Sequence, residues 1–193
     1  MRPRVAVLDH NMGNLRSVAK ALEASGADVR VTADPGEIDG CDHLCVPGQG
    51  IFGRCMDALG SGPLEDVVRT WVGDERPFLG ICLGMQALFQ ESDESPEKGL
   101  GILGGRCTRL TGDVTIPHIG WNTVIAPGEE TGTYFYFDHS YAVQPDDDAI
   151  VAGWCEHGTR FAASIRTGSV LAVQFHPEKS GAAGLDLLRG WVS

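Results

Sequence analysis

Cys82 stands in a stretch whose residue types are those of a catalytic nucleophile. Residues 77–88 read Pro-Phe-Leu-Gly-Ile-Cys-Leu-Gly-Met-Gln-Ala-Leu. The apolar run 78–81 is typical of a buried strand, and residues 83–91 are mostly good helix formers. Between them, Gly80-x-Cys82-x-Gly84 matches the strand-to-helix nucleophile elbow, with cysteine as the nucleophile. A Cβ on either flanking glycine would collide with the strand or the helix of so tight a turn.

The expected helix at 83–91 would place the Cys82 sulfur at its N-terminus, where the helix dipole favours thiolate over thiol. A buried structural cysteine in a strand is the alternative, because most free cysteines are of that kind. The elbow by itself leaves both interpretations open.

A second candidate group is the histidine and glutamate of Val-Gln-Phe-His-Pro-Glu, which ends at Glu178. A strand is expected over Ser169–Phe175, and His176 follows it. Catalytic groups gather where parallel strands end, so Cys82 and His176 can meet in space. The fixed φ of Pro177 and its effect on the preceding residue are expected to hold His-Pro-Glu extended. Glu178 could then bond one ring nitrogen of His176 and leave the other for sulfur, as in a catalytic triad.

Two motifs together resemble the class I, triad-type glutamine amidotransferases, namely Gly80-Ile-Cys-Leu-Gly-Met-Gln86 and His176-Pro-Glu178. Three further stretches are similar to the glutaminase subunits of imidazole glycerol phosphate synthases, a family of histidine biosynthesis. They are Asp9-His-Asn-Met-Gly-Asn-Leu-Arg-Ser17, Pro117-His-Ile-Gly-Trp-Asn122 and His139-Ser-Tyr141. The resemblance runs from about Val5 to the C-terminus and therefore covers nearly the whole chain.

The fold class implied by the resemblance is a flavodoxin-like α/β domain, with a mixed, mostly parallel sheet flanked by helices and additional short antiparallel strands in the second half. The residue pattern agrees, because strands and helices alternate in the first half. There we expect strands at 5–8, 29–32, 43–46 and 78–81, helices at 15–25, 52–59, 63–72 and 83–91, and a turn-rich connection at 34–40. The second half should hold a polar loop at 92–98, strands at 101–110, 115–125, 133–137, 149–155, 161–166 and 169–175, and a closing helix at 180–192. No linker is visible, so we expect one glutamine amidotransferase domain over residues 1–193.

The segment Pro47-Gly-Gln-Gly50 follows an expected strand and could be a plain loop. Its functional interpretation, which the resemblance favours, is an oxyanion strand formed by Gly48, Gln49 and Gly50. The glycines leave backbone N–H groups free to approach a substrate oxygen. The elbow would supply the second donor, the N–H of Leu83.

Further site residues follow from the resemblance alone. It implies that Gln86 holds the glutamine substrate, and that Gly50, Glu94, Ser140 and Tyr141 contact its α-amino and α-carboxylate groups. It also implies a face that docks on an ammonia-consuming partner, formed by Met12, Gly13, Asn14, Arg16, His118, Trp121, Asn122 and Tyr136. Two departures from the family pattern concern docking, because Asp138 stands where an apolar residue usually precedes His-Ser-Tyr, and His10-Asn11 replaces the commoner Tyr-Gly.

Composition excludes several classes of protein. The chain has 193 residues, 42% of them hydrophobic and 21% charged, as in an ordinary globular domain. Its formal net charge of −11 argues against nucleic-acid binding, whose footprint is basic. The apolar run 5–8 is too short for a signal peptide or a membrane span. The six cysteines show no pairing pattern, so a reducing cytoplasm is the expected location.

Two other motifs are set aside. Gly99-Leu-Gly-Ile-Leu-Gly104 matches the dinucleotide-binding fingerprint by letter, but it follows an acidic loop and precedes an alternating, strand-like stretch. Cys41-Asp-His-Leu-Cys45 lacks the usual spacing and the second ligand pair of a zinc site. No metal or organic cofactor is expected.

The resemblance implies hydrolysis of L-glutamine to glutamate and ammonia through a Cys82 thioester. It implies that ammonia passes to a (βα)8-barrel cyclase subunit, in a heterodimer that makes imidazole glycerol phosphate and aminoimidazole carboxamide ribotide. A glutaminase subunit of pyridoxal phosphate or anthranilate synthesis is one alternative, and a stand-alone γ-glutamyl hydrolase is another. A non-catalytic member of the fold would be expected to lack one residue of the triad, whereas all three are present.

Overall fold

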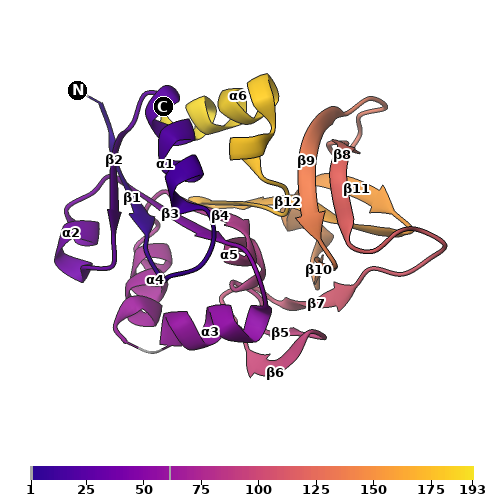
Figure 1. Cartoon of the computed structure of the whole chain (residues 1–193), viewed down its shortest axis with the longest axis horizontal. Coiled ribbons are helices and arrows are strands. Elements are labelled where there is room, and N and C mark those ends of the chain that lie inside the picture. The colour runs from indigo at the N-terminus through magenta and orange to yellow at the C-terminus, as the bar shows by residue number, and fades with distance from the viewer. Residues whose placement is uncertain (1, 61) are drawn as a thin grey trace.

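A seven-stranded mixed sheet forms the centre of the molecule in the computed structural model, which describes residues 2–60 and 62–193 (Figure 1). In spatial order its strands are β11 (Val151–His157), β12 (Thr159–Thr167), β13 (Val170–Val173), β4 (Phe78–Cys82), β3 (His43–Gly48), β1 (Arg4–Leu8) and β2 (Asp28–Thr32). The five strands from β13 to β2 are parallel, and β12 and β11 add antiparallel neighbours at one edge. The expected mixed, mostly parallel sheet is confirmed.

Helices cover both faces of this sheet. They are α1 (Leu15–Ala24), α2 (Pro35–Asp39), α3 (Phe52–Gly60), α4 (Leu64–Gly73), α5 (Leu83–Gln86) and α6 (Gly181–Val192), with 3-10 turns η1 (Asp148–Ile150) and η2 (Pro177–Lys179). Alternate residues of β1 point to opposite faces, so Val5 and Val7 pack with α1 and α6, while Ala6 and Leu8 pack with α3 and α4. Figure 1 shows α1 and α6 above the sheet and α3 and α4 below it. Among the described helices, none is both long and apolar enough to cross a membrane.

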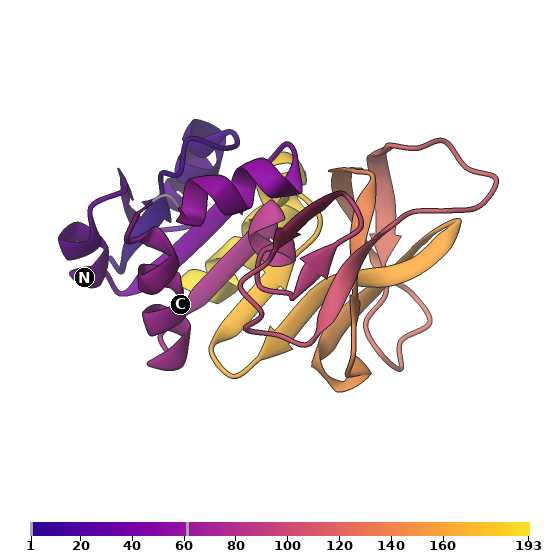
Figure 2. The same ribbon diagram turned by 90° about the horizontal axis from the view of Figure 1, so that it is seen from below.

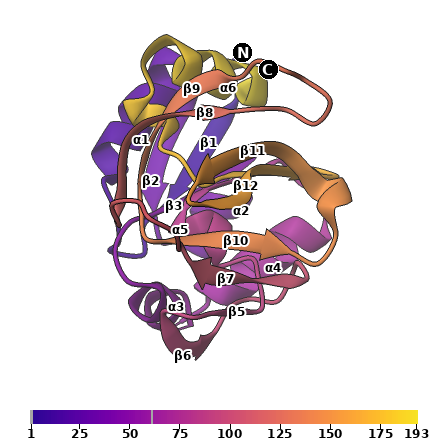
Figure 3. The same cartoon turned by 90° about the vertical axis from the view of Figure 1, so that its right-hand side faces the viewer.

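Two smaller sheets occupy the end of the molecule opposite β2 (Figures 1 and 2). One has the order β10 (Tyr141–Pro145), β7 (Gly105–Arg109), β5 (Glu91–Ser92) and β6 (Ser95–Lys98); the other is the hairpin of β8 (His118–Val124) and β9 (Thr133–His139). Figure 3 shows the hairpin on the α6 side of β11 and β12, and the four-stranded sheet on the α3 side. The second half therefore caps both faces of the antiparallel edge.

The predicted helix over 83–91 is wrong in length, because α5 ends at Gln86. Backbone N–H groups of residues 99–103 take over the carbonyls that a longer helix would use. Leu100 donates to Ala87 at 2.8 Å, and Gly101 donates to Phe89 at 3.0 Å. The chain can come so close only at a glycine, since a Cβ on Gly99 would lie 2.1 Å from the Phe89 carbonyl oxygen.

Other local predictions need correction. Residues 34–40 contain the short helix α2, because the Asp34 side chain caps its first N–H groups and Pro35 fits its first turn. The expected polar loop 92–98 contains most of the β5–β6 hairpin, and the strand expected from 101 begins at Gly105. Strand β10 was not predicted.

Two glycines allow the crossing at the end of β4. A Cβ on Gly80 would lie 2.7 Å from the Gly84 carbonyl oxygen, and a Cβ on Gly84 would lie 1.8 Å from that of Val46. Real Cβ atoms do not come so close to a backbone oxygen, so α5 packs on β3 only because residue 84 has no side chain.

Replacing Gly84 with Ala should therefore destabilise the protein by about 3 kcal/mol or more, through overpacking against backbone that cannot move aside. Thermal unfolding should show a midpoint lower by roughly 6 °C or more. Gly190→Ala is the matched control, since Gly190 lies in α6 and a Cβ there would have no atom within 4 Å, and it should stabilise by about 0.5–1 kcal/mol. Equal midpoints for Gly84→Ala and the native chain would contradict this role of the glycine.

Candidate active site

Cys82 occupies a strained backbone position between β4 and α5. Its φ of 53° and ψ of −107° lie outside the regions that ordinary residues adopt, a conformation that costs of order 1–3 kcal/mol and gathers at functional sites. The side chain is buried, with the residue 4% exposed. The local geometry is that of a nucleophile elbow, as the sequence predicts.

His176 and Glu178 follow the strand next to Cys82. Strand β13 pairs in parallel with β4, so the residues after both strands emerge at one edge of the sheet. The His176 Nδ1 lies 2.8 Å from Glu178 Oε1, and both side chains are almost completely buried. The prediction that His-Pro-Glu is extended is wrong after His176, because residues 177–179 form the 3-10 turn η2. This tight turn brings the carboxylate back onto the ring.

The electrostatics of His176 favour the imidazolium form. Burial alone would lower its pKa, but the neighbouring Cys82 and Glu178 side chains raise that pKa to about 10. Its Nε2 atom is buried and, beyond the interaction with Cys82, has no hydrogen-bond partner among the described residues. A protonated nitrogen beside the Cys82 sulfur is suited to donating a proton to a leaving group.

The other five cysteines differ from Cys82 in their surroundings. Burial raises the pKa of every one of these thiols. It raises the pKa of Cys55 and Cys155 to about 12, and it also raises the pKa of Cys41, Cys45 and Cys107. The dipole of α5 contributes less at Cys82 than the sequence suggested, because this helix has only four residues. The groups that face the sulfur are side chains instead.

A pocket of about 230 Å³ opens beside Cys82. Its walls come from β4, α5, the segment after β3, and the junction of β9 and β10. The lining residues are Gln49, Gly50, Cys82, Leu83, Gln86, Glu94, Pro117, Asp138, His139, Ser140 and Tyr141. All five residues expected to bind substrate thus line one cavity, while Gly48 is outside the lining and pairs in register with Cys82.

Glu94 and Gln86 are held by hydrogen bonds inside the site. Glu94 Oε2 accepts a hydrogen bond of 2.8 Å from the backbone N–H of Phe52, at the start of α3. Gln86 Nε2 donates to the Tyr141 carbonyl at 3.0 Å and to Gln174 Oε1 at 2.9 Å, while Gln86 Oε1 is buried without a partner in the described part of the chain. Gln174 was missed from the sequence, although a glutamine within a buried strand end is a signal for a polar contact.

The residues expected on the docking face differ in their exposure. Gly13, Asn14, Arg16 and Trp121 are exposed, Trp121 to 55%, and Met12, Asn122 and Tyr136 are half-buried. His118 contradicts the expectation, because it is only 4% exposed. Its Nδ1 contacts His139 Nε2 at 3.0 Å, and its ring stacks on His157. It therefore supports the hairpin from inside and cannot be a direct contact.

The loop before α1 packs on the expected oxyanion segment. The Met12 Cε atom lies 3.1 Å from the point where a Cβ on Gly50 would stand, and a Cβ on Gly13 would lie 3.3 Å from the Gln49 nitrogen. A partner that contacts this loop would therefore press directly on the segment that lines the pocket.

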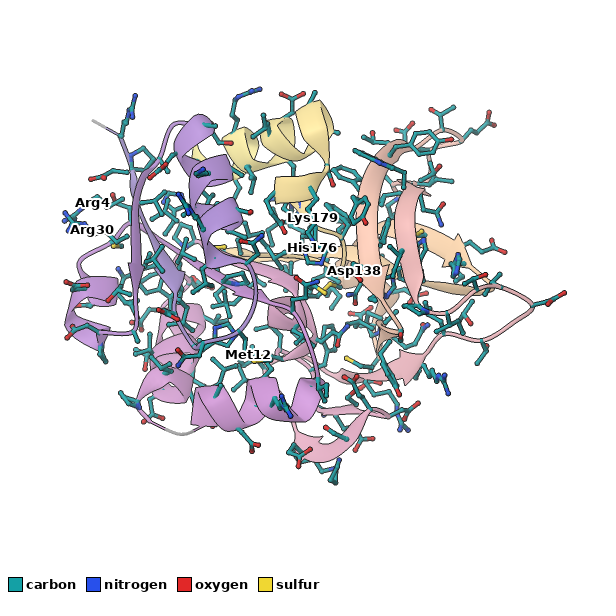
Figure 4. All side chains as sticks on the ribbon, in the orientation of Figure 1. Arg4, Met12, Arg30, Asp138, His176 and Lys179 are labelled. Atoms are coloured by element: carbon teal, nitrogen blue, oxygen red, sulfur yellow. The ribbon has the colours of Figure 1, made fainter. Side chains whose placement is uncertain are left out.

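Both departures from the family pattern have structural partners. Asp138 Oδ2 accepts a 2.8 Å hydrogen bond from Gln49 Nε2 and lies 3.6 Å from Lys179 Nζ. Asp138 and Lys179 are both labelled in Figure 4. The carboxylate thus connects the expected oxyanion segment to the turn that carries Glu178. His10 is buried, and its Nδ1 contacts the Leu8 carbonyl at 3.3 Å.

Across residues 2–60 and 62–193, no group of three histidine, cysteine, aspartate or glutamate side chains is arranged to hold a metal ion.

Comparisons with known proteins give matches over nearly the whole chain. The family model described as glutamine amidotransferase class-I matches residues 6–190. Two curated relatives are named imidazole glycerol phosphate synthase subunit HisH. The one from Rhodopirellula baltica is 41% identical over 98% of this chain and 97% of its own, and the one from Nocardia farcinica is 45% identical over 99% and 98%.

Solved structures share the fold. One, described as a glutamine amidotransferase, is 23% identical, with a TM-score of 0.78 over 97% of this chain and 98% of its own. Another, PurLQS from Thermotoga maritima, is 18% identical, with a TM-score of 0.78 over 100% of this chain and 98% of the matched chain. At such identities the likeness shows a common fold alone.

An analogue of glutamine with an electrophile at the side-chain end should label Cys82 and leave the other five cysteines unmodified. The reason is that the other thiols are buried and have raised pKa values, whereas Cys82 lines the pocket. Peptide mass spectrometry locates the adduct, and Cys82→Ser serves as the control that should remain unlabelled. Predominant labelling of Cys41, Cys45 or Cys55 would refute the assignment of the nucleophile.

Proposed function

Because this chain belongs to the class-I glutamine amidotransferase family, we propose that it is the glutaminase subunit of an imidazole glycerol phosphate synthase. The observation that carries the proposal is the strained Cys82 elbow beside the buried His176–Glu178 pair, in a chain 41–45% identical to curated subunits of that name. The family match over residues 6–190 supports one catalytic domain spanning residues 1–193.

In the proposed first half-reaction, the Cys82 thiolate attacks the carboxamide carbon of L-glutamine. Backbone N–H groups of Leu83 and of the Gly48–Gly50 segment hold the developing oxyanion. The His176 imidazolium gives its Nε2 proton to the leaving nitrogen as the C–N bond breaks. The products of this step are ammonia, a γ-glutamyl thioester on Cys82 and a neutral His176.

In the second half-reaction, neutral His176 takes a proton from water, and the resulting hydroxide attacks the thioester carbonyl. Loss of glutamate restores the thiolate and the imidazolium. Glu178 holds the proton on Nδ1 throughout, which keeps Nε2 facing the reacting atoms. Besides the substrate and water, the scheme uses side chains and backbone of this chain.

We further propose that the ammonia is consumed by a (βα)8-barrel cyclase subunit in a heterodimer, within the cytoplasm. The names of the relatives support a synthase with more than one subunit. The exposed side chains of Ile119, Trp121 and Tyr134 lie on the β8–β9 hairpin and offer an apolar docking face. The residues proposed to complete it are Met12, Gly13, Asn14, Arg16, Asn122 and Tyr136.

Cys82→Ser should reduce glutamine-dependent turnover of the complex with its cyclase at least about a thousandfold, because the nucleophile is lost. Ammonium salt supplied directly should restore cyclase turnover close to the native rate. The matched control is Cys41→Ser, a thiol before β3 that should leave both activities unchanged.

Glutamine-dependent turnover that survives Cys82→Ser would refute the role of this cysteine. A Cys82→Ser complex that ammonium cannot rescue would refute the coupling to a cyclase. In that case, a native chain that is fully active alone would indicate a stand-alone γ-glutamyl hydrolase.

A further inference from the structure

Gln174 is a completely buried amide in direct contact with the catalytic sulfur. It lies between the end of β13 and His176 and has no exposed surface. Its Nε2 lies 3.5 Å from Cys82 Sγ, a hydrogen-bonding distance for sulfur, and its Oε1 accepts from Gln86 Nε2 at 2.9 Å. Both polar atoms of this amide are therefore used inside the site.

Chemistry fixes which end of each amide faces which neighbour. The Tyr141 carbonyl oxygen can only accept, so the Gln86 atom 3.0 Å from it must be the NH₂ group. The Gln174 atom that receives the other Gln86 hydrogen must then be oxygen. The remaining Gln174 atom, which faces the sulfur, is consequently an N–H donor.

This arrangement has two consequences. An N–H donor stabilises a thiolate more than a thiol, because the hydrogen bond strengthens with the charge on sulfur. At the same time, Gln86 is held with both hydrogens engaged, so that its partnerless Oε1 is the atom left to accept from a bound ligand.

We propose that Gln174 is a positioning residue with two separable roles, donating a hydrogen bond to the Cys82 thiolate and orienting Gln86 as an acceptor toward the substrate. The inference rests on the proposed glutaminase function, to which it adds a residue outside the Cys–His–Glu triad. Met is the closest isostere without polar atoms, so Gln174→Met removes both roles while conserving volume.

The first test follows alkylation of Cys82 by iodoacetamide as a function of pH, in a readout that needs no glutamine turnover. For Gln174→Met the midpoint of the rate profile should move up by about one pH unit. At a given pH below the midpoint, the thiolate fraction of Cys82 would then be about tenfold smaller than in the native chain. Gln86→Met should move the midpoint less than Gln174→Met does, since Gln86 does not touch the sulfur and acts on it only through Gln174. Gln144→Met, at a glutamine that bonds the Arg160 carbonyl instead, is the distant control.

Steady-state kinetics of the complex with its cyclase separate the roles. Gln174→Met should lower kcat and raise KM for glutamine, whereas Gln86→Met should act mainly on KM. An unchanged alkylation midpoint in folded Gln174→Met would overturn the proposal. A shifted midpoint in a chain that never hydrolyses glutamine would instead uphold the sulfur contact and refute the proposed function.

A second measurement covers the case in which Gln174→Met does not fold. In the native chain, the side-chain amide protons of Gln174 should shift in NMR spectra across the alkylation midpoint, and those of Gln144 should not. Gln174 amide protons that stay constant through that pH range would also overturn the proposal.

Discussion

The buried carboxylate of Glu178 is the constraint on which the rest of the site depends. Its Oε1 contacts His176 Nδ1 at 2.8 Å, and its Oε2 has no partner within the described residues. A buried carboxylate without a cationic partner is strongly destabilising, so the fold favours a protonated His176. Because Cys82 and Glu178 together raise the pKa of His176 above its ordinary 6.5 to about 10, this stabilisation is complete below pH 6.5 and is lost as the pH rises through 10.

The turn that carries Glu178 also links the site to the proposed docking face. It is hydrogen bonded to β9, since the His176 N–H donates to the Tyr136 carbonyl at 2.8 Å. The Tyr136 N–H in turn donates to Ser180 Oγ, which itself donates to the His176 carbonyl. A partner bound to the outer face of the hairpin would therefore contact a strand that is already joined to the candidate triad.

Local chemistry made part of this structure predictable. The two glycines around Cys82 leave room for a tight turn, and strands and helices alternate along the first half, so the elbow and the mostly parallel sheet could be expected from the sequence. Tertiary contacts decided the rest. Helix α5 ends where it does because residues 99–103 bond to the carbonyls after it. His118 is buried because it stacks on His157. The role of Gln174 depends on two partners that are distant in sequence. These partners are distant in sequence, so the local residue pattern around each position does not identify them.

The most direct test of the charged triad is an NMR titration of ¹⁵N-labelled histidine, with the His176 signals assigned by their loss in His176→Asn. The imidazole should titrate with a midpoint near 10 in the native chain, and at lower pH in Glu178→Gln, where the carboxylate charge is removed. A native His176 that titrates near its ordinary value of 6.5 would contradict a Glu178-stabilised imidazolium beside Cys82.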